Sequence, residues 1–453
     1  MSIVGVTLVT AVRAACIAIL AVGGAVEGAR FLRSLRASVA GAYLWLTLLV
    51  FLFPSMLVGY HAAASRSAAD AGWVKELHYS FLVLIRVSHL ALLLVWLAPP
   101  VATFEGARAF TLMGRLPVLE RWRWKVRGWL GGFWPIIAVV FMCAFQEFDL
   151  AACMNARSWT IALFDAQAGG LALTESLKLM LWPLAVEGLA LGVLVFRVKT
   201  GMFASSGHRA EMPPHARPLA CDLLATLPFF GVLYILLAGP LVTLRDGWLG
   251  LPALAENFAL SGEVTNSFLL ALVSSVAAWF LAFWAYGNRS KVVLLVLPGL
   301  MGGLIVSLGL LALFQIPPLH LLRSTPIPVV LALVVLLLPS AVFVRHLLVR
   351  GMQSEAVHVA AMGRVGTVRW ALVKRPALWG GALLFLQAYG DFTANSLLAP
   401  ATLTSAFSRI FNLMHYGRTT VLTAMLLVTM AVPLLALLLT SLAVRTYASR
   451  RDS

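Results

Sequence analysis

The segment AFQEFDLAACM, residues 144–154, has a counterpart 244 positions later in AYGDFTANSLL, residues 388–398. This gapless pairing places Glu147 on Asp391 and Phe148 on Phe392. The same separation relates LFPSMLVG, which contains Pro54, to VLPGLMGG, which contains Pro298. A constant separation across distant segments predicts that the chain contains two copies of one structural unit.

The composition indicates that these copies lie in a lipid bilayer. Of 453 residues, 61% are hydrophobic and only 11% are charged, and the mean hydropathy is +0.92. A chain with so few charged residues cannot cover a soluble globule with polar side chains. The N-terminus lacks a basic stretch and a small-residue cleavage site, so we expect a retained membrane span there rather than a signal peptide.

Eleven segments are long and apolar enough to cross about 30 Å of hydrocarbon. The predicted spans are residues 5–27, 38–60, 78–100, 128–150, 173–196, 219–242, 264–286, 291–314, 325–348, 377–399 and 420–444. The first is the least secure because Arg13 lies inside it. The expected fold is an all-α polytopic membrane protein.

The formal net charge of +16 comes from Lys and Arg residues that gather in alternate loops between these spans. Such short clusters differ from the continuous basic face of a nucleic-acid-binding protein, so we expect no nucleic-acid partner. By the positive-inside rule the basic loops are cytoplasmic. This rule predicts a multi-pass protein of the cytoplasmic membrane, with its N-terminus outside and its C-terminus inside.

Each copy is expected to have five spans, with span six between them so that both copies run in the same direction. The predicted organisation is a degenerate first repeat over 1–200, a linker with the extra span and an outer loop over 201–260, and a second repeat over 261–453. Met113-Gly114-Arg115 in one long basic loop then corresponds to Met362-Gly363-Arg364 in another. Both loops are expected to face the cytoplasm.

The second loop resembles the EAA loop of type I ABC importer permeases. Its EAVHVAAMG stretch begins at Glu355, and Pro376 follows Gly363 at the thirteen-residue distance typical of the family. The next segment, ALWGGALLFLQAYGDFTANSLL, is similar to the helix of the iron(III), thiamine, polyamine and sulfate permease group. The resemblance is greatest over 264–445, and the two-copy chain resembles the iron(III) and thiamine branches.

The resemblance implies a transport subunit rather than an enzyme. Two separate ATPase subunits would bind ATP and magnesium, an extracytoplasmic binding protein would deliver the substrate, and this chain would hold no cofactor or metal. The implied substrate is iron(III) or a similar small cation, followed by thiamine or a polyamine. The implied ATPase-coupling residues are Glu105, Gly114, Arg115, Glu355, Ala360, Gly363, Arg364 and Pro376.

Both loops depart from the family pattern. Glu355 lies eight residues before Gly363, where the family has six; Glu105 is also displaced, and Arg127 replaces the proline of the first loop. The residues themselves predict a short surface helix over AVHVAAM, a sharp turn at Gly363 and the start of a membrane helix at Pro376. An ordinary amphipathic surface helix is the alternative interpretation of each loop.

Several motifs are absent from the sequence. It contains no GxxxxGK[ST] and no Gly-Lys pair, so it lacks the phosphate-binding loop of an ATPase. Its four cysteines show no CxxC spacing, which indicates neither a zinc site nor a disulfide framework. No HExxH or GxSxG motif indicates hydrolytic chemistry.

Ionisable side chains inside predicted spans are functional candidates, because an unpaired charge in a bilayer is costly. Glu147 and Asp391 resemble the acidic residue in the Gly-Asp/Glu-Phe stretch of the family. The expected cation pathway consists of Gln146, Glu147, Gln387, Asp391 and Asn395. In the alternative interpretation, the two acids cap or brace neighbouring helices.

Two further expectations concern the spans. Arg86 in span three is expected to neutralise Glu187 in span five. Aromatic residues near span ends are expected to anchor the chain at the membrane interface; these are Trp73, Tyr79, Trp159, Trp248 and Tyr416.

Two other functions fit the same pattern. An ion-gradient-driven secondary transporter would use Glu147, Glu187 and Asp391 as proton or cation sites. A degenerate membrane scaffold that transports nothing would explain why the first half of the chain departs from the family pattern.

Overall fold

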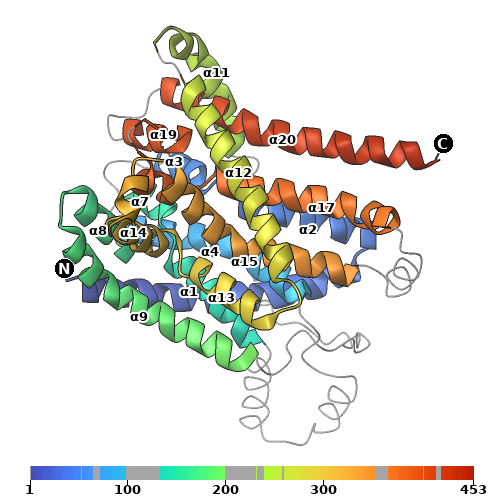
Figure 1. Ribbon diagram of the computed structural model, residues 1–453, viewed down its shortest axis with the longest axis horizontal. Helices are drawn as coiled ribbons and strands as arrows, with labels where there is room; N and C mark the ends of the chain where they lie inside the picture. Colours follow the sequence, from blue (N-terminus) through green and yellow to red (C-terminus); the bar gives the residue numbers. More distant parts are fainter. Residues whose placement is uncertain are drawn as a thin grey trace, which may run out of the picture. The chain divides into compact units, whose positions relative to one another are not determined.

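The computed structural model describes residues 2–52, 54–64, 72–97, 133–198, 231, 239–257, 260–351, 366–400, 402–414 and 420–452. Within these ranges every regular element is a helix (Figure 1). The expected all-helical fold is therefore confirmed. The chain divides into two compact units, Met1–Gly239 and Pro240–Ser453, and their boundary falls inside the predicted 201–260 linker.

The first unit is built around two long apolar helices that pack against each other, α1 and α4. Its helices are α1 (Ile3–Ser34), α2 (Ala37–Leu52), α3 (Ser55–Ala64), α4 (Gly72–Leu97), Phe133–Phe145, α7 (Asp149–Met154), α8 (Trp159–Ala168) and α9 (Leu173–Val198). Helix α1 begins after Ser2, whose hydroxyl accepts a hydrogen bond from the Gly5 N–H and so caps the first turn.

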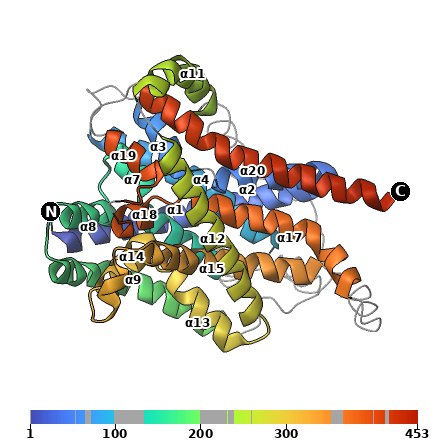
Figure 2. The same cartoon turned by 45° about the horizontal axis from the view of Figure 1, so that its top comes forward.

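The second unit is built around α12, which lies against α15 and α17 (Figure 2). Its helices are α11 (Gly239–Asn257), α12 (Ser261–Ala285), α13 (Arg289–Gly299), α14 (Gly303–Leu313), the 3₁₀ helix η2 (Leu319–Leu322), α15 (Ile327–Gly351), α17 (Gly366–Tyr389), α18 (Thr393–Leu398), α19 (Ala406–Met414) and α20 (Thr420–Asp452).

Helix contacts inside the two units follow the same order. In the first unit α1 and α2 both pack on α4, α3 packs on α7, and α8 packs on α9. In the second unit α12 and α13 both pack on α15, α14 packs on α18, and α19 packs on α20. These four helix pairs therefore recur in the same order in each unit.

Among the described residues, six helices are long and apolar enough to cross a membrane, which confirms a polytopic helical membrane protein. They are Ile3–Arg33, Gly72–Leu97, Leu173–Val195, Ser261–Ala285, Ile327–His346 and Thr420–Leu442. Each matches a span predicted from the sequence. Span six lies almost entirely outside the described residues.

Four other predicted spans are not the continuous helices that were expected. Residues 38–60 are divided between α2 and α3, and residues 291–314 are divided between α13 and α14, which are bent by 99°. Residues 128–150 and 377–399 are each interrupted before a short helix.

Proline and glycine explain the first two interruptions. Pro54 lies between α2 and α3, and it has no backbone N–H to donate the hydrogen bond that would continue a helix. Pro298 lies near the end of α13, and Gly302 follows with φ of +78°, a conformation that other residues rarely adopt. The sharp bend before α14 therefore has a local cause in the sequence.

Candidate functional site

Each unit contains a helix that ends at an aromatic residue, followed by a short break and a six-residue helix. In the first unit the Phe133–Phe145 helix ends at Phe145 and α7 begins at Asp149. In the second unit α17 ends at Tyr389 and α18 begins at Thr393. These positions differ by the 244 residues that separate the two sequence segments.

The backbone at the two breaks has matching geometry. Phe148 precedes α7 with φ −104° and ψ −50°, and Phe392 precedes α18 with φ −102° and ψ −40°. Each ring packs on a phenylalanine from the next helix: Phe148 on Phe164 at 4.9 Å, and Phe392 on Phe411 at 4.4 Å between ring centroids. The breaks are therefore packed into the interior in the same way.

The acidic residues of both breaks cap the short helices that follow. Glu147 Oε1 accepts the Leu150 N–H at 3.2 Å, and Asp391 Oδ1 accepts the Ala394 N–H at 2.9 Å. A carboxylate at this place satisfies an N–H without a partner inside the helix and lies at the positive end of the helix dipole. Both acids thus make the capping contact that the structural interpretation requires.

A hydroxyl from the first long helix of each unit holds the start of the helix after the break. Thr10 Oγ1 on α1 accepts the Trp159 N–H of α8 at 3.3 Å. Ser267 Oγ on α12 accepts the Ala406 N–H of α19 at 2.9 Å. The two units therefore share the same long-range hydrogen bond at the same place in their element order.

The two acids differ in how their charge is compensated. Arg86 Nη1 of α4 lies 2.5 Å from Glu147 Oε2, and the Glu147 side chain is 7% exposed. The expected pairing of Arg86 with Glu187 is therefore wrong. Glu147 lies in the break after the Phe133–Phe145 helix, and its side chain meets α4 there. Glu187 lies on a different helix, α9.

Asp391 forms no ion pair within the described part of the chain. Its backbone carbonyl accepts a hydrogen bond from Asn395 Nδ2 at 2.8 Å. Asn395 is buried, and its Oδ1 has no hydrogen-bond partner among the described residues. The break of the second unit therefore carries an uncompensated acid beside an amide oxygen that can still accept a hydrogen bond.

The expected pathway residues Gln146 and Gln387 are half-buried near the breaks. The Gln146 side chain interacts with the carboxyl group of Glu187, although neither Glu187 oxygen has a hydrogen bond of ordinary geometry to a described residue. Glu187 is fully buried. The structure thus brings Gln146, Glu147 and Glu187 into one region of the first unit, and Gln387, Asp391 and Asn395 into one region of the second.

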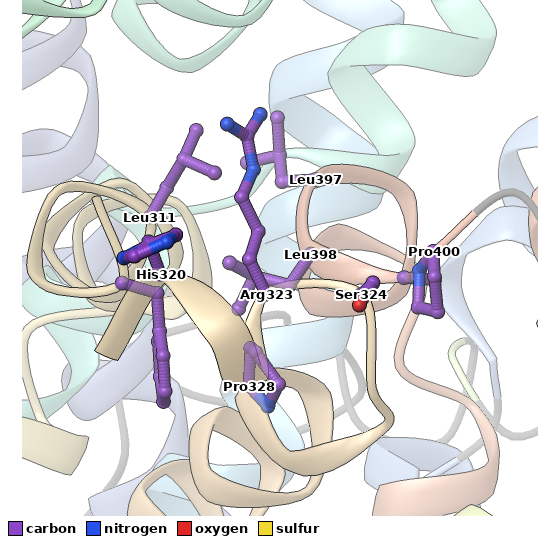
Figure 3. Close-up of a pocket in the computed structure, with 10 residues that line it drawn as sticks. Leu311, His320, Arg323, Ser324, Pro328, Leu397, Leu398 and Pro400 are labelled. Carbon is purple, nitrogen blue, oxygen red and sulfur yellow. The ribbon is translucent and has the colours of Figure 1, made fainter. Parts of the chain in front are cut away.

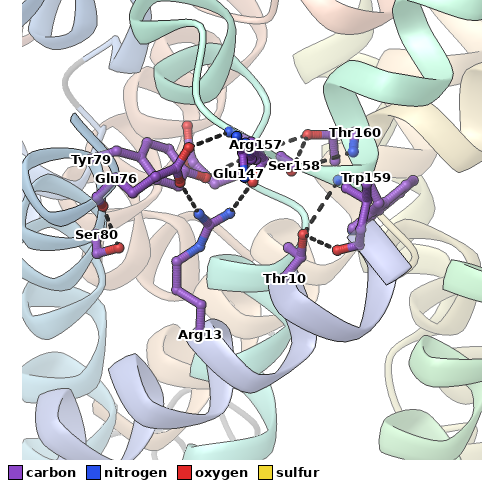
Figure 4. Close-up of polar contacts among 11 residues, drawn as sticks. Thr10, Arg13, Glu76, Tyr79, Ser80, Glu147, Arg157, Ser158, Trp159 and Thr160 are labelled. Carbon is purple, nitrogen blue, oxygen red and sulfur yellow. Dashed lines mark hydrogen bonds and ion pairs between the residues drawn. The ribbon is translucent and has the colours of Figure 1, made fainter. Parts of the chain in front are cut away.

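A polar cluster in the first unit was not predicted (Figure 4). Arg13 Nη1 lies 2.8 Å from Glu76 Oε2, and Arg13 Nη2 donates to the Arg157 carbonyl at 2.8 Å. Glu76 Oε1 in turn accepts the Arg157 N–H at 2.8 Å, and the Arg13 guanidinium lies over the Tyr79 ring. The sequence feature that could have predicted this cluster is the pair of opposite charges, Arg13 and Glu76, near the N-terminal ends of predicted spans one and three.

Two expected interfacial anchors are buried instead. Trp159 Nε1 donates to the Phe145 carbonyl at 2.8 Å, and the Tyr79 hydroxyl donates to the Glu147 carbonyl at 3.5 Å. Both side chains are 1% exposed, because their polar atoms satisfy carbonyls at the break of the first unit. Trp73 and Trp248 are exposed as expected, and Tyr416 lies outside the described residues.

The expected ATPase-coupling residues cannot be compared with the structure, apart from Pro376. Glu105, Gly114, Arg115, Glu355, Ala360, Gly363 and Arg364 lie outside the described residues. The expected helix start at Pro376 is wrong, because α17 already begins at Gly366. Its apolar part, Ala377–Tyr389, begins directly after the proline.

No three His, Cys, Asp or Glu side chains within the described ranges are grouped so that they could hold a metal ion. Comparison of the sequence with protein-family models, curated proteins and solved structures finds no match.

Proposed function

We propose that this chain is the membrane-spanning permease subunit of an ATP-driven ABC importer, with two parallel five-span repeats and one linking span. The observation that carries the proposal is the pair of matching breaks at Glu147 and Asp391. In the second unit the break ends the helix that follows the segment resembling the EAA loop.

The duplication supports the proposal because two similar units match the two ATPase subunits of an ABC importer. Two like units in one chain would offer two cytoplasmic loops, at 105–115 and 355–366, and a pair of ATPase subunits needs two docking points. The ATPases would bind ATP and magnesium, and an extracytoplasmic binding protein would deliver the substrate. The N-terminus would lie outside the cytoplasmic membrane and the C-terminus inside.

Helix α17 supplies a mechanical link in this proposal. It begins three residues after Gly363 and continues for 24 residues to Tyr389, two residues before Asp391. A helix of that length spans about 36 Å and can transmit a displacement as a rigid element. Closure of the two ATPases on ATP would push the loops together and open the pathway outward, and hydrolysis would reset it inward.

The proposed substrate is iron(III) or a similar small cation, followed by thiamine or a polyamine. In the first unit Arg86 already neutralises Glu147. Asp391 is therefore the acid that we expect to meet a cation, with Asn395 and Gln387 beside it.

An ion-gradient-driven secondary transporter is the second candidate, and the burial of Glu187 favours it. This carboxyl group is fully buried without an ion-pair partner among the described residues. A buried acid in a membrane helix is a typical proton or cation site. Such a transporter would need neither loop for an ATPase.

Affinity purification from native membranes distinguishes the two candidates. With the wild-type chain we expect an ATPase to copurify, identified by mass spectrometry and by ATP hydrolysis in the eluate. Gly363→Trp should remove it, whereas Gly309→Trp should retain it, because a Cβ atom added at Gly309 meets no atom within 4 Å. Absence of an ATPase, together with transport in inverted vesicles that follows a pH gradient without ATP, would support the secondary transporter.

A further inference from the structure

The second unit contains a cavity of about 480 Å³ where three segments end (Figure 3). One wall is the end of α14 with Leu311 and Phe314, and another is the end of α18 with Leu398. The third is the connection from η2 into α15, which contributes His320 and Arg323. The cavity therefore combines apolar walls with two nitrogen-bearing side chains.

His320 and Arg323 are placed on one side of the connection by its backbone. The Arg323 N–H donates to the His320 carbonyl at 3.2 Å, which is the bond of a 3₁₀ turn. Side chains three residues apart on such a turn project in the same direction. The two exposed side chains thus both line the cavity from one side of the connection.

The connection is held in place by its own hydrogen bonds. The His320 N–H donates to the Ile316 carbonyl, and the Thr325 hydroxyl donates to the Leu322 carbonyl at 2.6 Å. Thr325 Oγ1 also accepts the Ile327 N–H at 3.3 Å, which caps α15. The backbone that carries His320 and Arg323 is therefore ordered before any ligand arrives, which lowers the entropic cost of binding.

The electrostatics of the cavity favour a negative ligand. No Asp or Glu is among its lining residues, and the first turn of α15 adds the positive end of a helix dipole. Neither the Arg323 guanidinium nor the His320 ring has a hydrogen bond or ion pair with another described residue. Arginine binds carboxylate and phosphate groups through two parallel N–H donors, and histidine provides a ring N–H in either protonation state.

We propose that this cavity binds a small anion in which a carboxylate or phosphate group is joined to a short apolar chain. Arg323 and His320 hold the charged group, and Leu311 and Leu398 contact the apolar chain. A free organic anion and the headgroup region of an anionic lipid share this chemistry. The site depends on the cavity alone and is independent of the proposed transport function.

Hexanoate and hexylammonium are matched probes, because they share a chain length and differ in charge. Saturation-transfer NMR on the full chain in phosphatidylcholine nanodiscs should show saturable binding of hexanoate and at least about tenfold weaker binding of hexylammonium. Arg323→Gln combined with His320→Gln should weaken hexanoate binding by about tenfold or more. Arg245→Gln should leave it unchanged, because Arg245 is exposed on α11 and does not line the cavity.

Equal binding of the two probes, or hexanoate binding that survives the double substitution, would overturn the proposal. Ala399→Phe provides a second test, since a larger side chain in the cavity should also displace hexanoate while Arg323 and His320 both remain. Repeating the titration in phosphatidylglycerol nanodiscs separates the two sources. Weaker hexanoate binding in phosphatidylglycerol would show that the lipid headgroup competes for the cavity and is its occupant. Unchanged hexanoate binding would identify a free anion as the occupant.

Discussion

The Arg86 guanidinium lies 2.5 Å from the Glu147 carboxylate, whereas Asp391, at the matching break of the second unit, has no such partner in the described part of the chain. Both acids accept a backbone N–H of the short helix that follows, so both cap a helix. Their electrostatic situations are different. Arg86 compensates the charge of Glu147 in the first unit, whereas Asp391 in the second unit is left to a proton or a cation.

Removing either partner of the Arg86–Glu147 pair should destabilise the first unit. Arg86→Gln or Glu147→Gln leaves a largely buried charge without compensation, and we expect each to lower the free energy of unfolding by about 3 kcal/mol. The double substitution should cost less than the two single costs added together. Unfolding in detergent by a chemical denaturant measures these values.

Lys178→Gln is the matched control for this cycle, because the Lys178–Glu175 pair has a similar 2.7 Å separation but both side chains are exposed. We expect a change of less than about 1 kcal/mol. Strictly additive costs for Arg86 and Glu147 would show that the pair is not coupled.

Asp391→Asn should separate the capping role from the charge. Asparagine retains an oxygen that can accept the Ala394 N–H, so the free energy of unfolding should change by less than about 1 kcal/mol. Uptake of a cationic substrate should fall by about tenfold or more, because the uncompensated charge is lost. Glu256→Gln, on the exposed side of α11, is the control. Full transport by Asp391→Asn would leave this acid with only a structural role.

Close helix packing at Gly299 should not tolerate a side chain. A Cβ atom there would lie 2.2 Å from the Val335 carbonyl oxygen and 2.7 Å from Pro339 Cδ. We expect Gly299→Ala to destabilise the second unit by about 2 kcal/mol or more, since helix α13 must move away from α15. Gly309→Ala meets no atom within 4 Å and should be neutral or slightly stabilising. Similar melting temperatures for the two variants would argue against this packing.

The hydroxyl bonds to α8 and α19 should contribute equally to the two units. Thr10→Val and Ser267→Ala each leave a buried N–H without its acceptor, and each should cost about 1 to 2 kcal/mol. Thr265→Val, which removes an exposed hydroxyl bonded only to its own helix, should change stability by less than about 0.5 kcal/mol. A cost for Thr10→Val alone would mean that the two units differ at this contact.

Local sequence patterns predicted the features that depend on short segments. Long apolar runs predicted eleven spans, and six of them match long apolar helices in the described part of the chain. The pairing of 144–154 with 388–398 located two breaks with similar backbone geometry. Hydropathy averaged over a span concealed the interruptions at Pro54 and Gly302, because a single proline or glycine hardly changes the mean of twenty apolar residues. Those two residues were nevertheless visible causes of a break.

Contacts between distant helices could not be derived from the sequence. The sequence suggested Glu187 as the partner of Arg86, whereas the packing of the folded unit places Arg86 on Glu147. Trp159 suited an interfacial anchor by composition, but its indole N–H satisfies the Phe145 carbonyl instead. The cavity at Arg323 forms where the ends of α14 and α18 come together, and this arrangement cannot be predicted from the sequence of either segment alone.

In the proposed importer, the loops containing Gly114 and Gly363 both face the cytoplasm, where the two ATPase subunits bind them. In a background from which Cys16, Cys143, Cys153 and Cys221 have been removed, Gly114→Cys and Gly363→Cys can each be labelled with a membrane-impermeant maleimide. We predict that both positions react in inverted vesicles and that neither reacts in right-side-out vesicles. Labelling of the two positions from opposite sides of the membrane would contradict the parallel repeats and the ATP-driven importer built on them.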